Sequence, residues 1–146
     1  VIPEDLNMSS IFSDVQNLVI VKNSAGEIYA PNFKINSIGD WNVTDGYFVF
    51  VSSPTILNLR GFLAEPTTPI NLNEGWNLVS YLPNIELSAS NAFESIESNL
   101  IFAKDRLGNV YHPIYGINTI GNIKVGKGYW IYVNSDCQLI YPNIGN

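Results

Sequence analysis

The chain has little charge, one histidine and one cysteine, and each scarcity excludes a class of function. Charged residues make up 14% of its 146 residues, against about 25% in an average soluble domain. A single cysteine, Cys137, excludes an internal disulfide. With seven Lys and Arg and a net charge of −6, the chain lacks a basic surface, and we expect no nucleic-acid partner. It has no apolar run of about 18 residues, so we expect no membrane insertion.

The residues that usually carry catalysis or bind metals do not form a recognisable set. His112 precedes a proline in a predicted hairpin, where neither an orienting carboxylate nor a nucleophile is evident. Cys137 follows Asp136, whose charge opposes the thiolate, so we interpret it as a structural thiol. Zinc and EF-hand spacings are absent. We expect no enzyme, no catalytic residues, no metal and no cofactor; calcium at the Gly26 and Gly108 turns and hydrolase chemistry stay open as alternatives.

The chain contains an internal repeat. Residues 18–51 align with residues 100–133 at a constant offset of 82, without a gap. Of the 34 aligned positions 13 are identical: Leu18/Leu100, Lys22/Lys104, Gly26/Gly108, Tyr29/Tyr111, Pro31/Pro113, Ile35/Ile117, Asn36/Asn118, Ile38/Ile120, Gly39/Gly121, Val43/Val125, Gly46/Gly128, Tyr47/Tyr129 and Val51/Val133. Because repetition at a fixed period reflects architecture, we expect the shared residues to serve packing and chain reversal.

The second copy contains a complete set of element signals. A turn around Gly75 precedes an apolar strand over 76–82, and Ser88 is placed to cap a short helix with Phe93 and Ile96 on its apolar side. Further strands are predicted over 100–104, 110–115, 129–133 and 138–141. We therefore expect a five-strand unit with one short helix.

The first copy repeats this order from its helix, predicted over 9–15, but lacks the opening strand. Val1-Ile2-Pro3 resembles Tyr81-Leu82-Pro83, the end of that strand, and nothing matches Gly75–Ser80. We expect an open sheet edge in the first copy that another segment covers. Since the chain begins at Val1 rather than Met, we also expect a processed product or a piece of something longer.

These signals predict a mostly β fold built from two pseudo-symmetric copies of a five-strand unit, barrel-like or sandwich-like, each with one short helix. The first unit spans 1–63 and is truncated at its N-terminus. A Pro-containing junction spans 64–69, and the second, complete unit spans 70–146. The junction is too short for a free linker, so we expect the units to share an interface.

The strand predicted over 129–133 is apolar on both faces. Trp130 and Tyr132 lie on one face and alternate with three apolar residues on the other. The corresponding strand of the first copy, 47–51, has the same pattern. This favours a central strand covered on both sides; the alternative is a strand whose aromatic face is half exposed.

Three motifs carry a family resemblance. The segments GWNLVSYLP, KDxxGxxYxPxYGINTIG and GKGYWIYV, at 75–83, 104–121 and 126–133, together resemble a repeated β-module appended to secreted and cell-surface bacterial proteins. In such proteins a GWN-led and a GxGYW-led strand recur in tandem. The resemblance covers nearly the whole chain and implies an accessory, non-catalytic module. The first copy departs from it, because Asp45-Gly46-Tyr47-Phe48 replaces GKGYW and the GWN strand is absent.

Aromatic side chains are the best candidates for a binding site. Flat rings can contact the C–H faces of sugars while Asn and Asp side chains bind the hydroxyls. We take Trp41, Trp130, Tyr132 and Tyr115 as candidate sugar-stacking residues, and Trp41 is included because it falls in a loop. The alternative is that the shared aromatic residues fill the core of a small protein.

Composition suggests where such a protein works. Asn, Ser, Thr and Gly take the place of charge, which is typical of extracellular β-proteins, and we expect a secreted or cell-surface bacterial protein. The leading hypothesis is a non-catalytic structural or interaction module, a spacer or adhesion element whose partners are neighbouring domains of a longer chain. The alternative is a carbohydrate-binding module whose partner is a polysaccharide.

Overall fold

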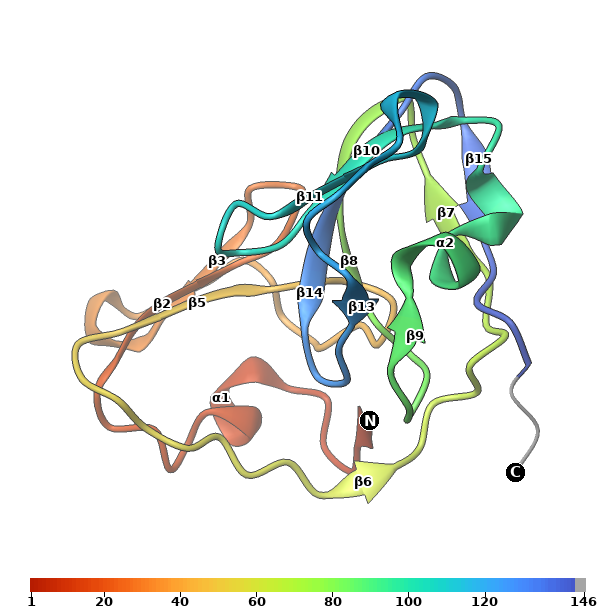
Figure 1. Ribbon diagram of the computed structural model, residues 1–146. Coiled ribbons are helices and arrows are strands. Elements are labelled where there is room, and N and C mark those ends of the chain that lie inside the picture. Colours follow the sequence, from red (N-terminus) through yellow and green to blue (C-terminus); the bar gives the residue numbers. More distant parts are fainter. Residues whose placement is uncertain (144–146) are drawn as a thin grey trace.

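The computed structural model describes residues 1–143, and over these residues the fold is mostly β (Figure 1). The first part contains β1 (Ile2–Pro3), α1 (Met8–Ile11), β2 (Leu18–Lys22), β3 (Ile28–Ala30), η1 (Pro31–Phe33), β4 (Ile35–Asn36), β5 (Phe48–Val51) and β6 (Gly61–Phe62). The second part contains β7 (Ile70–Leu72), β8 (Gly75–Ser80), β9 (Leu87–Ser88), α2 (Ala89–Ala92), η2 (Glu94–Ile96), β10 (Leu100–Lys104), β11 (Val110–His112), η3 (Pro113–Tyr115), β12 (Ile117–Asn118), β13 (Asn122–Ile123), β14 (Gly128–Val133) and β15 (Cys137–Leu139). Positions 144–146, the predicted end of the second unit, lie outside the described residues.

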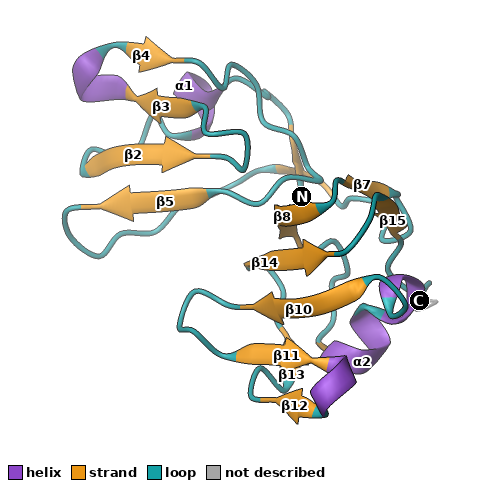
Figure 2. Ribbon diagram, turned by 90° about the horizontal axis from the view of Figure 1, so that it is seen from above, coloured by secondary structure: helices purple, strands orange, loops and turns teal. Residues whose placement is uncertain are grey.

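Two antiparallel sheets contain most of these strands (Figure 2). The first has the order β4-β3-β2-β5 and the second the order β12-β11-β10-β14-β8. Strand register is the same in both at the offset of 82; for example, Leu18 pairs with Val51 as Leu100 pairs with Val133. Over residues 1–143 the first sheet has no counterpart of β8, so β5 is its outermost strand. An axis that relates the two copies stays a prediction.

Several shared residues make the same hydrogen bonds in both copies. In the first copy the Asn36 side chain accepts from the Gly39 N–H at 2.9 Å, and the Tyr47 hydroxyl accepts from the Asn42 N–H at 2.8 Å. The equivalent bonds of the second copy are both 2.8 Å and join Asn118 to Gly121 and Tyr129 to Lys124. These side chains hold the loop between the β4 or β12 strand and the next long strand. The identities therefore reflect turn and loop geometry.

Both helices are a single turn and begin at polar caps. The Ser88 hydroxyl accepts from the Asn91 N–H at 3.2 Å, as its position predicted. In the first copy the cap is Asn7, whose side chain accepts from the Ser9 N–H at 2.9 Å. Each helix is shorter than predicted. The helix α2 ends before the 3-10 turn η2, which contains Ile96, and α1 ends at Ile11.

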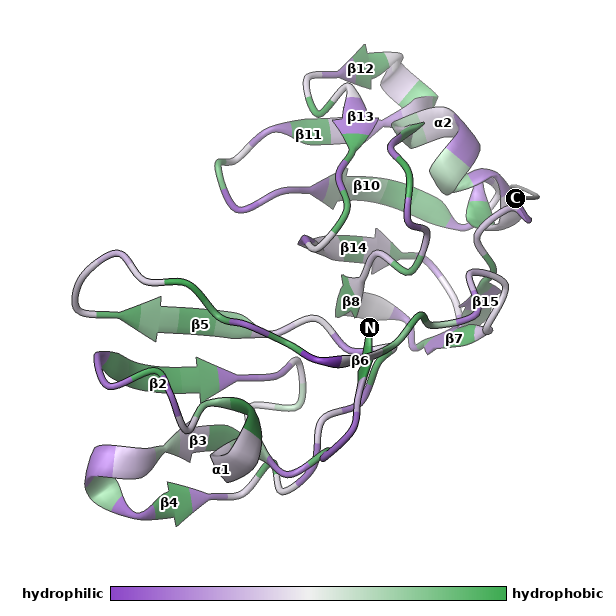
Figure 3. Cartoon of the chain, turned by 90° about the horizontal axis from the view of Figure 1, so that it is seen from below, coloured by the Kyte–Doolittle hydropathy of each residue, from purple (hydrophilic) through white to green (hydrophobic). Residues whose placement is uncertain are grey.

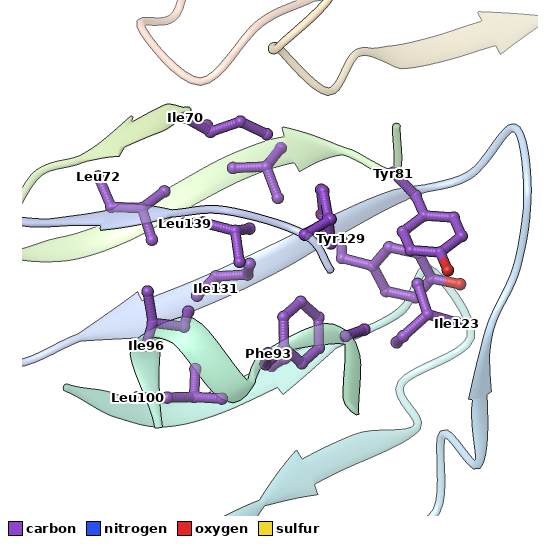
Figure 4. Close-up of a cluster of buried hydrophobic side chains, with 14 of the residues drawn as sticks. Ile70, Leu72, Tyr81, Phe93, Ile96, Leu100, Ile123, Tyr129, Ile131 and Leu139 are labelled. Atoms are coloured by element: carbon purple, nitrogen blue, oxygen red, sulfur yellow. The ribbon is translucent and has the colours of Figure 1, made fainter. Parts of the chain in front are cut away.

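The larger hydrophobic core belongs to the second sheet (Figure 4). Its inner face packs against α2, η2 and the two-stranded pair of β7 and β15. Phe93, Ile96 and Ile131 are among the buried residues, with 0–1% of their surface exposed. The other members named in Figure 4 are Ile70, Leu72, Tyr81, Leu100, Ile123, Tyr129 and Leu139. The predicted apolar side of the helix thus faces the core.

A second, smaller cluster lies under the first sheet. Its buried members are Met8, Ile11, Phe12, Val15, Leu18, Val21 and Tyr29, from α1, the segment after it and the sheet. Residues of β5 and of the chain after it are only partly buried against this cluster; they include Val51, Leu57 and Leu59. The core of the first copy is therefore well covered on the side of α1 and only partly covered beside β5.

The structure bears on two alternatives about the sheets that the sequence left open. Over the described residues no sheet closes as a barrel, because each sheet ends in an outer strand. The strand β14 is central, as expected, but only its inner face, with Tyr129, Ile131 and Val133, is buried. Trp130 and Tyr132 are half-buried on the other face, and within residues 1–143 no further layer of strands or helices covers this face. Figure 3 shows apolar residues along the strands of both sheets.

The two halves are joined through the outer edge of β8. The Gly46 N–H donates to the Leu78 carbonyl at 3.0 Å, and the Ser80 N–H donates to the Thr44 carbonyl at 3.2 Å. A side chain at Gly46 would lie 2.8 Å from the Val79 carbonyl oxygen, so the approach requires glycine. The halves contact one another as the short junction indicated; the boundaries at 63/64 and 69/70 stay predictions. No helix within residues 1–143 is long and apolar enough to cross a membrane.

Candidate functional site

The uncovered face of the second sheet is aromatic. Residues directly opposite one another on neighbouring antiparallel strands point to the same side of the sheet. Tyr132 of β14 lies opposite Trp76 of β8 and opposite Phe102 of β10. Trp130 shares this face, because it lies two residues from Tyr132 on the same strand. Three adjacent strands therefore place four aromatic rings on the face opposite the core.

Trp76 is at the centre of these rings. Its ring centroid lies 4.9 Å from that of Phe102, 5.2 Å from that of Tyr132 and 6.2 Å from that of Trp130, and all three contacts are edge-to-face. Phe102 and Tyr132 are stacked at 6.1 Å with an interplanar angle of 12°. Such pairs contribute about 0.5–1.5 kcal/mol beyond burial of their area. The rings are thus held by one another in fixed orientations.

The aromatic face continues past β11 into the turn η3. The His112 ring stacks on Phe102 at 6.1 Å, and Tyr115 meets the His112 ring edge-on at 4.6 Å. Tyr115 is 75% exposed and Trp76 is 43% exposed, so the face reaches solvent both at η3 and at β8. We define the aromatic face as Trp76, Phe102, His112, Tyr115, Trp130 and Tyr132.

One positive charge accompanies these rings. The Lys104 ammonium nitrogen lies 4.8 Å from the centre of the Trp76 ring, within the range of a cation–π contact. Such a contact fixes the lysine over the face and leaves part of its hydrogen-bonding capacity for a ligand. The face can therefore bind an apolar or flat surface and, at one end, an oxygen acceptor.

Three of the four predicted binding residues lie together on this face. Trp130, Tyr132 and Tyr115 come from β14 and η3, and the contacts through Phe102 and His112 connect them. Sequence reasoning did not name Trp76, Phe102, His112 and Lys104 as binding residues. The signal that could have found them is strand register, since an antiparallel pairing of 76–80 with 128–132 aligns Trp76 with Tyr132.

Trp41 lies elsewhere. Its ring stacks on Tyr47 at 4.5 Å and packs against the core of the first copy. The indole nitrogen is buried and has no hydrogen-bond partner among the described residues. Its loop position suggested exposure, but the Tyr47 hydroxyl bonds the backbone of Asn42 and draws this loop onto the sheet. Trp41 is therefore half-buried against the first copy and is not part of the aromatic face.

The asparagines that were expected to bind sugar hydroxyls mostly serve turns. Asn109 donates to the Asp105 carboxylate at 2.8 Å, and Asn77 donates to the Asn73 carbonyl at 2.8 Å. Asn99 donates to Ser135 at 2.7 Å and so ties two loops together. These amides satisfy backbone and side-chain groups that turns leave without partners. The high Asn content thus has a structural origin in this fold.

Titratable groups with shifted pKa values lie in turns and in the core. Burial alone would raise the pKa of Asp105, but hydrogen bonds from Asn109, Leu107 and Gly108 outweigh it and hold the pKa below its ordinary value. Burial, with a smaller contribution from Asp136, raises the pKa of Cys137. The sulfur packs against the main core. Within residues 1–143 no cluster of three or more His, Cys, Asp or Glu side chains is present.

Comparison with known proteins gives no assignment: the chain matches no family model, no curated protein and no solved structure. The geometry of the aromatic face is therefore the basis for proposing a function.

Proposed function

We propose that this chain is a non-catalytic interaction module, a spacer or adhesion element of a bacterial secreted or surface protein, that contacts its partner through the aromatic face. The observation that carries the proposal is the group of mutually packed rings around Trp76, which reaches solvent although the opposite face of β14 in the same sheet is buried. Contiguous apolar surface of this kind is uncommon on soluble proteins outside interaction sites.

The placement of the chemically versatile side chains supports a binding role. His112 lies between the rings of Phe102 and Tyr115 and serves the packing of the face. Cys137, with its raised pKa, packs under the sheet on the core side. Tyr and Trp provide large, rigid contact area with a polar end, which suits interfaces with proteins and with polysaccharides alike.

A polysaccharide is the second candidate partner. Lys104 beside Trp76 supplies the one charged donor on an otherwise apolar, flat surface, and flat rings with an adjacent donor suit a sugar chain that offers C–H faces and hydroxyl acceptors. A face with one lysine among apolar rings disfavours a strongly acidic or basic partner, because a single charge gives little electrostatic attraction.

Tyrosine substitution at the η3 end of the aromatic face tests the proposal. Tyr115→Ala should weaken binding to whichever target is recognised by at least about fivefold, because the exposed ring is lost without loss of core packing. Its repeat counterpart Phe33 is 72% exposed and off the aromatic face, so Phe33→Ala is the matched control. Tryptophan fluorescence with a panel of neutral polysaccharides and with bacterial and host cell surfaces would measure binding.

The outcomes separate the two partners. A fluorescence change with one polysaccharide that Tyr115→Ala abolishes supports the carbohydrate alternative. Binding to a protein or cell surface with the same sensitivity supports the adhesion role. Equal binding by both variants would place the contact surface elsewhere and overturn the proposal.

A further inference from the structure

The first copy exposes residues whose counterparts are completely buried. Val49 of β5 is 41% exposed, whereas its counterpart Ile131 of β14 is 0% exposed. Leu57 is partly buried, while Leu139, its counterpart at the same offset, is 0% exposed. The same amino-acid pattern therefore lies inside one unit and at the surface of the other.

The covering element in the second copy is the pair of strands β7 and β8. β8 pairs with β14 along its whole length, from Gly75 to Ser80. Val79 of β8 and Tyr81 after it enter the core between the sheet and α2, together with Ile70 and Leu72 of β7. No strand within residues 1–143 holds this position beside β5. Figure 2 shows β5 at the outer edge of its sheet, on the side of the second sheet.

A cleft occupies the corresponding place in the first copy. Its volume is about 530 Å³. Its lining from the first unit includes Val1, Trp41, Tyr47, Val49, Leu57 and Leu59, and residues 80–82 and 126–128 of the second unit line its other side. Apart from Val1, these first-unit residues have counterparts that are all buried members of the main core, to which residues of β7 and β8 also belong: Ile123, Tyr129, Ile131, Leu139 and Tyr141. The cleft is thus the part of the core that β7 and β8 fill in the second unit.

The backbone of β5 is arranged to accept a strand. In the second copy the Tyr81 N–H donates to the Lys127 carbonyl at 3.2 Å. In an antiparallel pair every second residue directs its N–H and C=O to the same neighbouring strand. Ile131, four residues after Lys127, therefore also directs its backbone groups to β8. Because β5 has the same register with β2 that β14 has with β10, Val49 directs its N–H and C=O to the open edge. An exposed edge of four apolar residues (Figure 3) is a template for strand addition.

The other face of β5 carries a place for a tryptophan. In the second copy Trp76 packs on Phe102 and Tyr132 under the Lys104 ammonium group. The first copy has Ile20, Phe50 and Lys22 at these three positions. Phe50 is 51% exposed, and Lys22 is exposed as well. An incoming strand with Trp opposite Phe50 would meet an aromatic ring and a cation, as Trp76 does.

We propose that the open edge of β5, with the cleft beneath it, is a docking site for an antiparallel strand of the sequence type of residues 70–82, supplied by another repeat module of this kind. The strand adds to the first sheet as β8 adds to the second. Main-chain hydrogen bonds give affinity, and the alternating side chains give specificity: the tryptophan lies over Phe50 and Lys22, and the Val side chain enters the cleft, which Val1 also lines. The site is independent of the aromatic face, which lies on the other sheet.

A peptide with the sequence of residues 70–82 tests this site on the intact chain. At saturating peptide, amide hydrogen exchange at Val49 and Val51 should slow by at least about tenfold, with no slowing at Ile131, which β8 already covers. The control is the same peptide with Val79→Asp, which places a charge in the cleft and should bind at least about tenfold more weakly.

Two protein variants locate the contact. Val49→Lys points a charge into the cleft and should weaken peptide binding by at least about tenfold, while folding is retained because Val49 is already 41% exposed. Ile114→Lys, at an exposed position of the second unit, should leave peptide binding unchanged. A chain with residues 70–80 placed directly before Val1 gives a readout that does not depend on peptide affinity, and it should melt at least about 4 °C higher.

Three results would overturn the proposal. In one, the peptide leaves exchange at Val49 unchanged and the extended chain melts no higher. In another, the peptide binds equally to the Val49→Lys and Ile114→Lys variants. In the third, the chain alone forms a dimer that protects Val49, which would make a second copy of β5 the occupant of the edge.

Discussion

Residues 18–51 and 100–133 adopt the same strand order and register but differ in what covers them. The inner face of β14 is completely buried, whereas Val49 of β5, the counterpart of Ile131, is 41% exposed. Local sequence is similar at both strands, so the difference comes from β7 and β8, which pack on one sheet only. Burial in this fold is therefore decided by a neighbouring segment, and the repeat itself supplies strand pairing, turns and loop anchors.

The largest expected contrast is between the two equivalent strand residues Ile131 and Val49. Ile131→Ala removes a side chain with no exposed surface and should lower the free energy of unfolding by about 2–5 kcal/mol. Val49→Ala removes a half-exposed one and should cost less than about 0.5 kcal/mol. Urea unfolding measures both. Equal costs would mean that the two strands are equally covered in solution.

A smaller contrast comes from the residue after each 3-10 turn. Lys34 has φ of 56° and Gly116, its counterpart, has φ of 64°, a left-handed conformation that favours glycine. Lys34→Gly should stabilise the first unit by up to about 1 kcal/mol, and Gly116→Lys should destabilise the second by about 1 kcal/mol. Thermal melting measures the pair. Shifts of the same sign would show that the two turns differ in conformation.

The smallest contrast concerns the turns between β2 and β3 and between β10 and β11. Asp105 has a lowered pKa in the folded state. Its ionised form therefore stabilises the fold at pH values above the unfolded pKa near 3.8. This stability is lost as the pH falls through the folded pKa. Asp105→Asn should cost less than about 1 kcal/mol at pH 7, because Asn23 accepts a backbone bond at the equivalent site. The cost should vanish below the folded pKa.

The reciprocal change is the control for this pH dependence. Asn23→Asp replaces the amide that donates to the Glu27 carboxylate at 2.7 Å by a second negative charge. It should destabilise the chain at pH 7 and recover on acidification. A pH-independent cost for either variant would contradict the assignment of the shifted pKa to these turn hydrogen bonds.

The sequence predicted the features that depend on local chemistry. The cap at Ser88, the turn glycines and the antiparallel pairing within each repeat follow from residue types at fixed spacing. The choice between a barrel-like and a sandwich-like unit could not be made from the sequence, because closure of a barrel depends on whether the two outer strands of a sheet meet in space. The helices were predicted too long, since their limits are set by packing of η2 and of the chain after α1 against each sheet.

The candidate site was predicted in part for the same reason. Trp130, Tyr132 and Tyr115 could be chosen because the alternation within one strand and the repeat alignment are visible in the sequence. Trp76 and Lys104 could be chosen only with the strand register in hand, because their meeting depends on two strands that pair with opposite edges of β14. Trp41 lies apart from the aromatic face, because the Tyr47 anchor draws its loop onto the first sheet, where the ring is half-buried; a binding role for it stays a prediction.

Amide hydrogen exchange of Val49 and Ile131 in the free chain tests the central claim, that the first copy is open where the second is closed by β8. The Ile131 amide should exchange only when the second sheet unfolds globally, and the Val49 amide should exchange orders of magnitude faster. Equal protection at both amides would show that a strand already covers β5 and would contradict this account.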